Sequence, residues 1–553
     1  MLNRSGLLLV MLIVASSGLY LIGNGSVALW DRDEPRFAQT SRQMLQSGDW
    51  VVPHYLDIPR TAKPAFIYWC QATAMSVLGD NAFAARLPSA MAIIILLILL
   101  PIVLMRHIGL QRTVWMVFVF ATSGLVIANA KMCITDAVLL LWVTIAQLCL
   151  YAIWQGNASW PVLLTMAAAI GLAGLTKGPV VLGFLAMTLI ALAVLRLIDS
   201  RFVPLPAEEA PAVRRRASNV FMKTIVGLII VAAITLPWVL MVNYRASAFL
   251  RTAVSHEVWD RMMTPLEQHT GPPGYYLLTI WITFFPWSML LPTAIGLAIR
   301  YRANPKTRFA LAAIVGPWIM LECVRTKLPH YFLPVFPALA FLTADAIVRC
   351  LAGQHDHLKS RGFIRAIGAC AILIAIATSA SWVVMRAYRP LPYAAMTVIS
   401  ILGILFGATV FVLFKTLRAT AAAVAMGVGT MALVGVIYGW YLPEAQFLRL
   451  SPRVADVLIA NDVVHPHQVI MLGYMEPSLA FYQGGTMREA GQIGLARNFI
   501  PQFPQWMVVS ADVWNHATPD VRELFDVVAD VRGLAYAQGR WVDVMVLRRK
   551  AAG

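Results

Sequence analysis

Long apolar runs recur along the chain, and short polar segments separate them. About thirteen of these runs are long enough to cross the hydrocarbon core of a bilayer as helices. They are residues 6–24, 87–105, 113–130, 136–154, 160–175, 178–197, 224–243, 275–298, 308–323, 330–349, 363–385, 395–414 and 421–441. The pattern therefore predicts a polytopic α-helical membrane protein. The apolar run of the first segment is long, which favours a retained anchor over a cleaved signal peptide.

The composition agrees with this class of protein. Hydrophobic residues make up 59% of the 553 residues and charged residues only 13%, proportions that exclude a soluble globular protein. The formal net charge is +17, but Lys and Arg gather in short loops, where they set topology and meet anionic lipid rather than nucleic acid. The six cysteines show no CxxC spacing, so we expect neither a disulfide framework nor a cysteine metal site.

The loop charges predict the orientation of the chain. If about thirteen spans alternate, the basic loops fall on one side, which the positive-inside rule assigns to the cytoplasm. These loops contain residues 106–112, 201–223, 300–308, 349–365 and 415–418. The outer side then receives residues 25–86, 131–136, 176–179, 244–274, 322–330 and the tail from about 442. Every candidate catalytic residue lies on that outer side, where charge at the ends of apolar helices indicates function.

The first outer loop, residues 25–86, has an interfacial pattern. It predicts two helices that lie on the membrane surface. The first begins near Pro35 and ends at Gly48, and the second begins after Pro64 and ends near Gly79.

The tail changes character from about residue 442. It carries three strand patterns separated by helical stretches. The strands are expected at 467–472, 506–509 and 541–547. We therefore expect a membrane domain over 1–441 and a small outer α/β domain over 442–553.

Motifs in the outer segments resemble those of a known family. They are Asp33-Glu34-Pro35-Arg36-Phe37-Ala38, Ser47-Gly48-Asp49-Trp50-Val51-Val52-Pro53, Lys63-Pro64 with Tyr68-Trp69, Thr176-Lys177-Gly178, and Lys327-Leu328-Pro329-His330-Tyr331. As a set they resemble the lipid A 4-amino-4-deoxy-L-arabinose transferases, which belong to the protein O-mannosyltransferase-like glycosyltransferases of the GT-C fold. The resemblance implies a polyprenyl-phosphate sugar donor, an inverting transfer on the periplasmic face, and a central catalytic acid in the first outer loop. Asp33 stands at the matching position.

Sugar transfer from a lipid phosphate needs both carboxylates and cations. Positive charge develops on the sugar and negative charge on the leaving phosphate. Asp33 could orient or deprotonate the nucleophile, and Glu34 is a second candidate, although either acid could instead cap the helix that starts at Pro35. Asp136 stands where the family has an acid, and its alternative role is also a helix cap.

The outer face also carries candidate phosphate-binding cations. Lys63 precedes a proline, which holds it extended, and it could bind the donor phosphate. The alternatives are an anchor to lipid head groups for Lys63 and a structural role in a tight turn for Lys177. The other candidates are Arg36, Arg60, Arg245, Arg325 and Lys327, with Tyr68 and Tyr331 as further site residues.

The outer loop 244–274 is expected to be flexible and to close over the donor, because Gly271 to Gly274 breaks any helix there. His256 and Asp260 are one helical turn apart within it, a spacing that can hold a divalent metal but also occurs by chance. We expect no required cofactor. A divalent metal and a polar role for His256 stay open alternatives.

The surplus of cations over acids suits two phosphates, one on the donor and one on the acceptor. Together with the resemblance, it predicts transfer of 4-amino-4-deoxy-L-arabinose from undecaprenyl phosphate to lipid A phosphate at the bacterial inner membrane. This would lower the negative charge of the outer membrane and give resistance to cationic peptides such as polymyxin. We expect a monomer that contacts bilayer lipids and binds no nucleic acid.

Three alternatives stay open. A transferase of the same fold could use a protein Ser/Thr hydroxyl or another glycan as the acceptor. A lipid transporter would also have many spans, but it would place charges near mid-membrane and often show repeated halves. A receptor or scaffold would explain an outer domain but not the acids and lysines at the helix ends.

Overall fold

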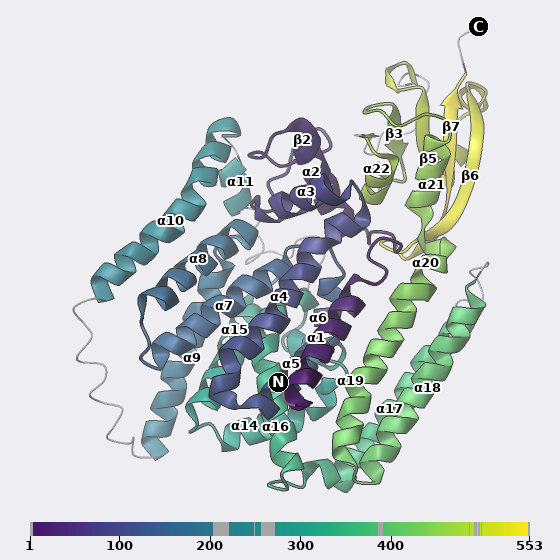
Figure 1. Ribbon diagram of the computed structural model, residues 1–553. Coiled ribbons are helices and arrows are strands. Elements are labelled where there is room, and N and C mark those ends of the chain that lie inside the picture. Colours follow the sequence, from purple (N-terminus) through teal and green to yellow (C-terminus); the bar gives the residue numbers. More distant parts are fainter. Residues whose placement is uncertain are drawn as a thin grey trace.

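The chain folds as a large helical bundle with a sheet at one end (Figure 1). The computed structural model describes residues 4–202, 220–247, 249–255, 271–384, 391–485, 487–490 and 500–550, together with Leu495 and Asn498. The surface helices of the first outer loop and the C-terminal sheet lie at the same end of the bundle, as Figure 1 shows.

Every predicted span coincides with a helix or with a bent pair of helices. The helices are α1 (Arg4–Leu21), α4 (Ala82–Ile108), α5 (Leu110–Ala121), α6 (Gly124–Ala130), α7 (Asp136–Trp154), α8 (Trp160–Lys177), α9 (Val180–Phe202), α10 (Val220–Arg245), α13 (Tyr275–Thr283), α14 (Leu291–Arg300), α15 (Pro305–Cys323), α16 (Phe336–Leu351), α17 (Arg361–Val384), α18 (Tyr393–Lys415) and α19 (Ala419–Val436). Within the described residues, nine helices are long and apolar enough to cross a membrane, or eleven if each bent pair is one span. The multi-pass architecture is therefore confirmed. The number thirteen stays a prediction, because it also needs α1 and α15 to span.

Two of the spans are bent, and their bends meet. The axes of α5 and α6 differ by 63°, and those of α13 and Trp287–Arg300 by 120°. The backbone N–H of Gly124 donates to the carbonyl of Phe285 (2.8 Å), and Trp287 donates from Nε1 to the Thr122 hydroxyl (2.9 Å). Each bend thus satisfies polar groups that the other leaves unpaired inside the membrane.

Both predicted surface helices of the first outer loop are confirmed. They are α2 (Asp33–Ser47) and α3 (Phe66–Leu78), which pack against each other, and a short antiparallel pair, β1 (His54–Tyr55) and β2 (Ile58–Pro59), lies between them in the chain. Gly48 ends α2 with φ +70°, a left-handed conformation that glycine adopts at little cost. No side chain caps α2: its N-cap residue is Arg32, so the capping role considered for Asp33 and Glu34 is wrong.

The C-terminal segment forms a mixed five-stranded sheet in the order β4-β3-β5-β7-β6. Its elements are α21 (Leu450–Ile459), β3 (Val469–Leu472), α22 (Pro477–Gln483), β4 (Arg488–Glu489), β5 (Trp506–Ser510), α23 (Ala511–Asn515), α24 (Pro519–Arg522), β6 (Phe525–Ala535) and β7 (Arg540–Arg549). Strand β3 is parallel to β4 and β5, whereas β7 is antiparallel to β5 and β6. The three predicted strands are confirmed. The sequence did not predict β6, because charged residues interrupt its apolar alternation.

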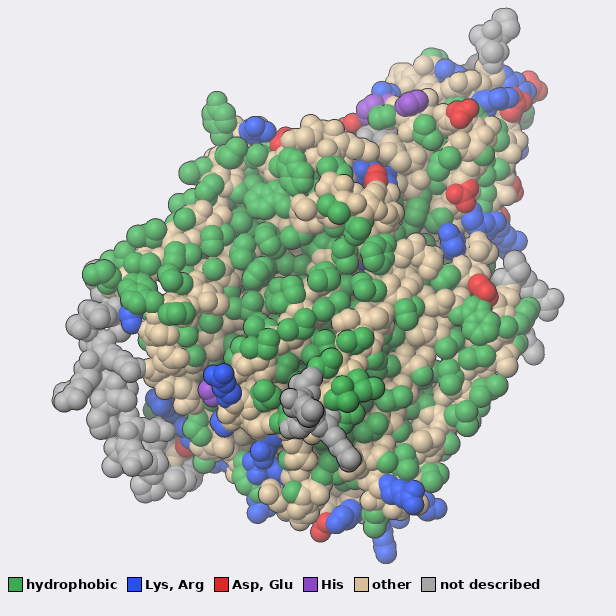
Figure 2. Space-filling model, in the orientation of Figure 1, with side chains coloured by type: hydrophobic (Ala, Val, Ile, Leu, Met, Phe, Trp, Pro, Cys, Tyr) green, Lys and Arg blue, Asp and Glu red, His purple; other side chains and the backbone are tan. Residues whose placement is uncertain are grey.

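The C-terminal sheet is not isolated from the membrane half. Helix α22 packs against α2 of the first outer loop. Figure 2 shows hydrophobic side chains over the middle of the visible face, with Lys and Arg toward the end opposite the sheet and, together with most of the visible Asp and Glu, around the sheet. This distribution agrees with a membrane belt between a basic end and an end that carries the sheet.

The predicted orientation can be tested with a cysteine at Asp520, which is exposed in α24. In cells that carry an Asp520→Cys variant, we expect a thiol reagent that cannot cross the inner membrane to label the protein, because the loop charges place this end outside. The background is Cys323→Ser, since Cys323 is exposed.

An Arg418→Cys variant in the same background is the matched control, because Arg418 is exposed at the opposite, basic end of the bundle. It should react only after permeabilisation. Labelling of the control in intact cells, with none at position 520, would reverse the topology.

Candidate active site

The first outer loop carries two adjacent acids that lie in different environments. Asp33 is exposed at the start of α2, whereas Glu34 is completely buried. Asp33 is therefore accessible from outside, whereas Glu34 can contact only groups inside the fold.

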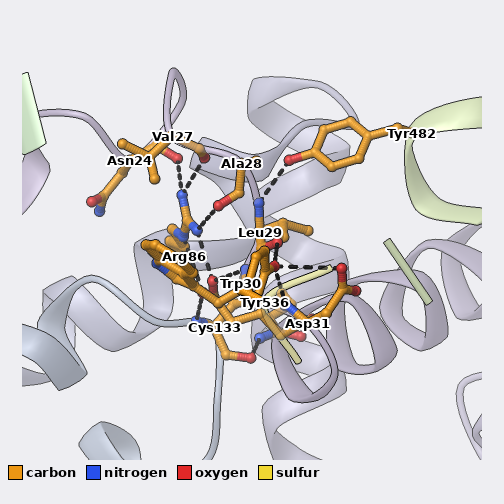
Figure 3. Close-up of polar contacts among 12 residues, drawn as sticks. Asn24, Val27, Ala28, Leu29, Trp30, Asp31, Arg86, Cys133, Tyr482 and Tyr536 are labelled. Atoms are coloured by element: carbon orange, nitrogen blue, oxygen red, sulfur yellow. Dashed lines mark hydrogen bonds and ion pairs between the residues drawn. The ribbon is translucent and has the colours of Figure 1, made fainter. Parts of the chain in front are cut away.

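Glu34 forms a buried, bidentate ion pair with Arg86, which is labelled in Figure 3. Arg86 donates from Nη2 to Oε2 (2.7 Å) and from Nε to Oε1 (3.0 Å). The backbone N–H groups of Trp30 and Cys133 donate to the same two oxygens (2.8 and 2.7 Å). Each carboxylate oxygen thus has two donors, an arrangement that suits an anchor. We keep Asp33 as the candidate catalytic acid of this pair.

Asp136, the first residue of α7, meets two basic side chains from other elements. Its Oδ1 lies 2.6 Å from Lys177 Nζ at the end of α8, and its Oδ2 lies 3.9 Å from His330 Nε2. His330 belongs to η6 (Pro329–Val335), the 3₁₀ helix before α16. Lys177 Nζ also lies over the ring of Tyr331, 4.6 Å from its centroid. Asp136 makes no side-chain cap to its own helix, and its charged partners lie in this cluster.

Asp33 and Lys63 belong to the same neighbourhood. Both lie close enough to His330 to interact with it electrostatically, and the charge of Lys63 also acts on Asp136. Lys63 donates from Nζ to the Ala62 carbonyl (2.8 Å). We call Asp33, Lys63, Asp136, Lys177, His330 and Tyr331 the outer-face cluster. Its two acids and two lysines come from the first outer loop, α7 and α8.

A second group of predicted residues flanks this cluster. Arg60 donates from Nε to the hydroxyl of the buried Tyr68 (3.0 Å) and lies over the ring of Phe37, 5.2 Å from its centroid. Phe37 stacks on Tyr68 at 5.6 Å between centroids. Arg36 interacts electrostatically with Glu489 of the C-terminal sheet. Arg36 thus lies where the first outer loop faces that sheet.

Three other predicted cations are engaged differently. Arg245 Nη1 lies 3.1 Å from Asp49 Oδ1 at the surface. Lys327 is buried, with Nζ 2.9 Å from Glu322 Oε2. Arg325 is exposed in the loop after α15. Because two of the three have carboxylate partners, the positive charge left for phosphates is smaller than the sequence suggests.

The metal prediction at His256 and Asp260 lies outside the described residues, as does the rest of the segment 256–270 in the expected lid. Across the part of the chain that the structure describes, no group of three or more His, Cys, Asp or Glu could hold a metal ion. A metal at His256 and Asp260 stays a prediction.

Sequence reasoning missed the residues that hold the loop around Asp33. Arg86 had a usable signal, because a charged side chain directly before an apolar span is costly unless it has a partner. Asp31 and Tyr536 had none, since they lie far apart in the chain and meet through the hydroxyl of Tyr536.

Comparison with known proteins places this geometry in a family context. The Dolichyl-phosphate-mannose-protein mannosyltransferase family matches residues 6–251. The undecaprenyl phosphate-alpha-4-amino-4-deoxy-L-arabinose arabinosyl transferase of Edwardsiella ictaluri is 30% identical over 65% of this chain and 63% of its own length. The second transferase of that name in Pseudomonas fluorescens is 29% identical over 66% and 61%. The matched part thus covers less than two thirds of these relatives.

Solved structures extend the likeness over the whole chain. ArnT from Cupriavidus metallidurans bound to undecaprenyl phosphate superimposes with a TM-score of 0.76 at 19% identity, covering 98% of both chains. Its apo state gives 0.72 at 20% identity, with 97% of both chains covered. The chain has the GT-C fold of these transferases. The resemblance seen in the sequence motifs is confirmed, and the match includes the C-terminal segment, which the motifs did not cover.

The Glu34–Arg86 pair is expected to hold the first outer loop against the membrane helices, and this can be tested by mutation. A Glu34→Ala variant leaves Arg86 buried without a counterion, and breaking a buried pair in this way costs about 3–5 kcal/mol. We expect a clear fall in the melting temperature of the detergent-solubilised protein. Asp526→Ala is the control, because Asp526 pairs with Arg548 and Lys550 at the surface. It should cost under about 1 kcal/mol. Equal melting temperatures for both variants would contradict the anchor.

A second variant separates charge from structure at Asp33. Because Asp33 is exposed, Asp33→Asn should leave abundance and melting temperature unchanged. If its charge acts in the reaction, the rate of sugar transfer should fall at least about 100-fold. Transfer at the wild-type rate would remove Asp33 from the mechanism.

Proposed function

We propose that the chain is an inverting glycosyltransferase that moves 4-amino-4-deoxy-L-arabinose from undecaprenyl phosphate to a phosphate group of lipid A. The observation that carries the proposal is the outer-face cluster, in which an exposed acid, Asp33, lies near Lys63 and the Asp136–Lys177 pair. The named relatives and the shared fold support this choice of donor and sugar. The reaction takes place on the periplasmic face of the bacterial inner membrane.

The reaction divides the cluster by charge. An oxygen of the acceptor forms a bond to the anomeric carbon while the bond from that carbon to the donor phosphate oxygen breaks, and the electron pair stays on the leaving undecaprenyl phosphate. Lys63 and Lys177 stabilise the charge that grows on this phosphate. Asp33 orients the nucleophile on the opposite side of the sugar, as inversion requires. Asp136 holds Lys177 in place, since its Oδ1 lies 2.6 Å from Nζ.

A phosphate acceptor suits this site because it needs little activation. The second pKa of a phosphate monoester is about 6, so the group is largely ionised at neutral pH, whereas a hydroxyl needs a strong base to lose its proton. Guidance by cations is then the main requirement, and Arg36 and Arg60 flank the cluster on the side of the C-terminal sheet. Capping a lipid A phosphate with an aminosugar lowers outer-membrane charge and weakens binding of cationic peptides such as polymyxin.

A hydroxyl acceptor is the second candidate, because the family that matches residues 6–251 is named for transfer to protein. It requires Asp33 to act as a true base rather than as an orienting group. A lipid transporter fits less well, since the described charges gather at the two ends of the helices and not near mid-membrane.

The acceptor test uses the full-length protein in detergent with undecaprenyl-phosphate aminoarabinose as donor. Mass spectrometry should detect the sugar on phosphorylated lipid A, with at least about 100-fold less product on a dephosphorylated analogue, because the analogue lacks the ionised nucleophile. Asp33→Asn is the negative control. Chelation of divalent ions in parallel tests the metal prediction for His256 and Asp260.

Two outcomes would reject the assignment. Equal use of both lipids would mean that the phosphate is not the acceptor. Transfer only to a Ser/Thr peptide would favour the hydroxyl-acceptor candidate.

A further inference from the structure

The segment that precedes Asp33 is held by the C-terminal sheet as well as by the membrane half. Asp31 accepts two hydrogen bonds from Ser478 of α22, one from the backbone N–H to Oδ1 (3.0 Å) and one from Oγ to Oδ2 (2.6 Å). The backbone N–H of Asp31 donates to the hydroxyl of Tyr536, which follows β6 (2.6 Å). Side chain and backbone of one residue are thus fixed by two separate parts of the C-terminal segment, helix α22 and the turn that follows β6.

The same hydroxyl reaches a second point of the segment (Figure 3). Tyr536 donates to the Leu29 carbonyl (3.2 Å), and the backbone N–H of Leu29 donates to the hydroxyl of Tyr482 (2.8 Å). The ring of Tyr536 also packs edge-on against Trp30, with centroids 5.3 Å apart. We call Asp31, Ser478, Tyr482 and Tyr536 the sheet clamp.

The sheet clamp rests on buried polar groups of its own. Ser478 Oγ also bonds to Ser451 Oγ (2.6 Å), which bonds to the hydroxyl of Tyr474 (2.7 Å). All three side chains are at most 3% exposed. Because these partners are packed in the core of the C-terminal segment, they cannot easily follow a displaced loop. The clamp therefore fixes where the loop lies relative to the sheet.

Asp33 stands between this clamp and the Glu34–Arg86 anchor. Two residues before it, Asp31 is bonded to the sheet, and the next residue is bonded to Arg86 and Cys133. In contrast, Asp33 itself is exposed. A side chain that is not packed depends on its backbone for its position, so both attachments are needed to aim the carboxylate.

We propose that Asp31 is a positioning residue through which the C-terminal sheet, by way of Ser478 and Tyr536, holds Asp33 in the geometry for transfer. The proposal rests on the proposed function for its kinetic consequence. It gives the C-terminal segment a part in the reaction, although the outer-face cluster is built from the first outer loop, α7, α8 and η6.

The contact is also sensitive to pH. Burial raises the pKa of Asp31 to about 7, the nearby charge of Glu476 adds to the rise, and the hydrogen bonds from Ser478 oppose it. The other titratable groups that face it are Tyr474, Tyr482, Tyr536 and Tyr55, and Glu476 itself pairs with Arg32.

The sign of the effect follows from the two protonation states. The docked loop has a pKa of about 7 at Asp31, and a free aspartate has 3.8, so docking favours the protonated form. The docking free energy from this group is fully present below about pH 4 and falls as the pH rises through about 7. We therefore expect tighter docking in a mildly acidic periplasm.

The kinetic test compares three variants of the full-length protein. Asp31→Ala removes both acceptors for Ser478, and Tyr536→Phe removes one hydroxyl but keeps the ring that packs on Trp30. We expect kcat to fall about 10- to 100-fold for the first and about 3- to 10-fold for the second, with KM for the donor within about 2-fold, because a misplaced group slows the reaction step without weakening substrate binding. Asp526→Ala is the matched control and should keep kcat, because Asp526 is an acid on β6 that pairs with Arg548 and Lys550 at the surface.

Hydrogen exchange supplies a readout that needs no substrate. In Asp31→Ala, the amides of residues 27–34 should exchange faster, while the amides of the sheet keep their protection. In the wild type, protection of residues 27–34, corrected for the intrinsic rate, should fall as the pH rises through about 7. Asp31→Asn should show no such step, because an amide has no proton to lose in this range.

The two proposals fail in different ways. If the wild type transfers aminoarabinose and Asp31→Ala keeps its kcat, the positioning role is wrong and the function stands. If the wild type is inactive with this donor, the function is wrong, and the exchange experiment still decides whether Asp31 docks the loop. Loss of protection throughout the sheet in both Asp31→Ala and Tyr536→Phe would assign the clamp to the stability of the sheet alone and overturn the proposal.

Discussion

The buried ion pair between Glu34 and Arg86 is the interaction on which the outer face depends. Two charges removed from water are costly, and they are tolerated only when nearly every donor and acceptor finds a partner. Here Arg86 also donates to the carbonyls of Asn24, Val27 and Ala28, and Glu34 also accepts from Trp30 and Cys133. One pair therefore joins the first outer loop, the start of α4 and the turn before α7. Because that turn leads directly to Asp136, the ion pair fixes the positions of the two candidate acids, Asp33 and Asp136, relative to each other.

The helix that begins at Asp33 explains why the two adjacent acids differ. Successive side chains on an α-helix point about 100° apart, so an inward Glu34 turns Asp33 away from the core. The burial of one acid thus sets the exposure of the other. A sequence shows two acids in a row and gives no sign of which one faces inward. The structure decides this through Arg86, which approaches from α4.

The sequence predicted the positions of most helices and strands well, but it did not predict the side-chain contacts between them. Each apolar run that was predicted to span the membrane coincides with a helix or a bent pair of helices. Gly48 and Gly79 marked the ends of the two surface helices. Both signals are local in the sequence. Asp136 and Lys177 were each singled out, but their 2.6 Å pair depends on how α7 and α8 pack. The contact between Asp31 and Ser478 spans 447 positions of the chain. Side chains that meet across such a separation leave no periodic trace. The pairing of Lys327 with Glu322 is local, but it reduced the expected surplus of free cations as well.

The pairing of lysines with carboxylates has a chemical consequence for the proposed reaction. An unpaired lysine in a partly buried site would bind the donor phosphate tightly and would bind the product, undecaprenyl phosphate, just as well. Lys177 is already held by Asp136, with the ring of Tyr331 beneath its Nζ. A phosphate must then share this cation with a carboxylate, so it gains less from binding in the ground state. The carboxylate weakens the attraction for the extra charge on the leaving oxygen as well, but this charge adds to a total that the lysine still attracts. Carboxylates beside the lysines therefore favour product release over tight donor binding, and the acids of the proposed site act through the cations they restrain as well as through the nucleophile.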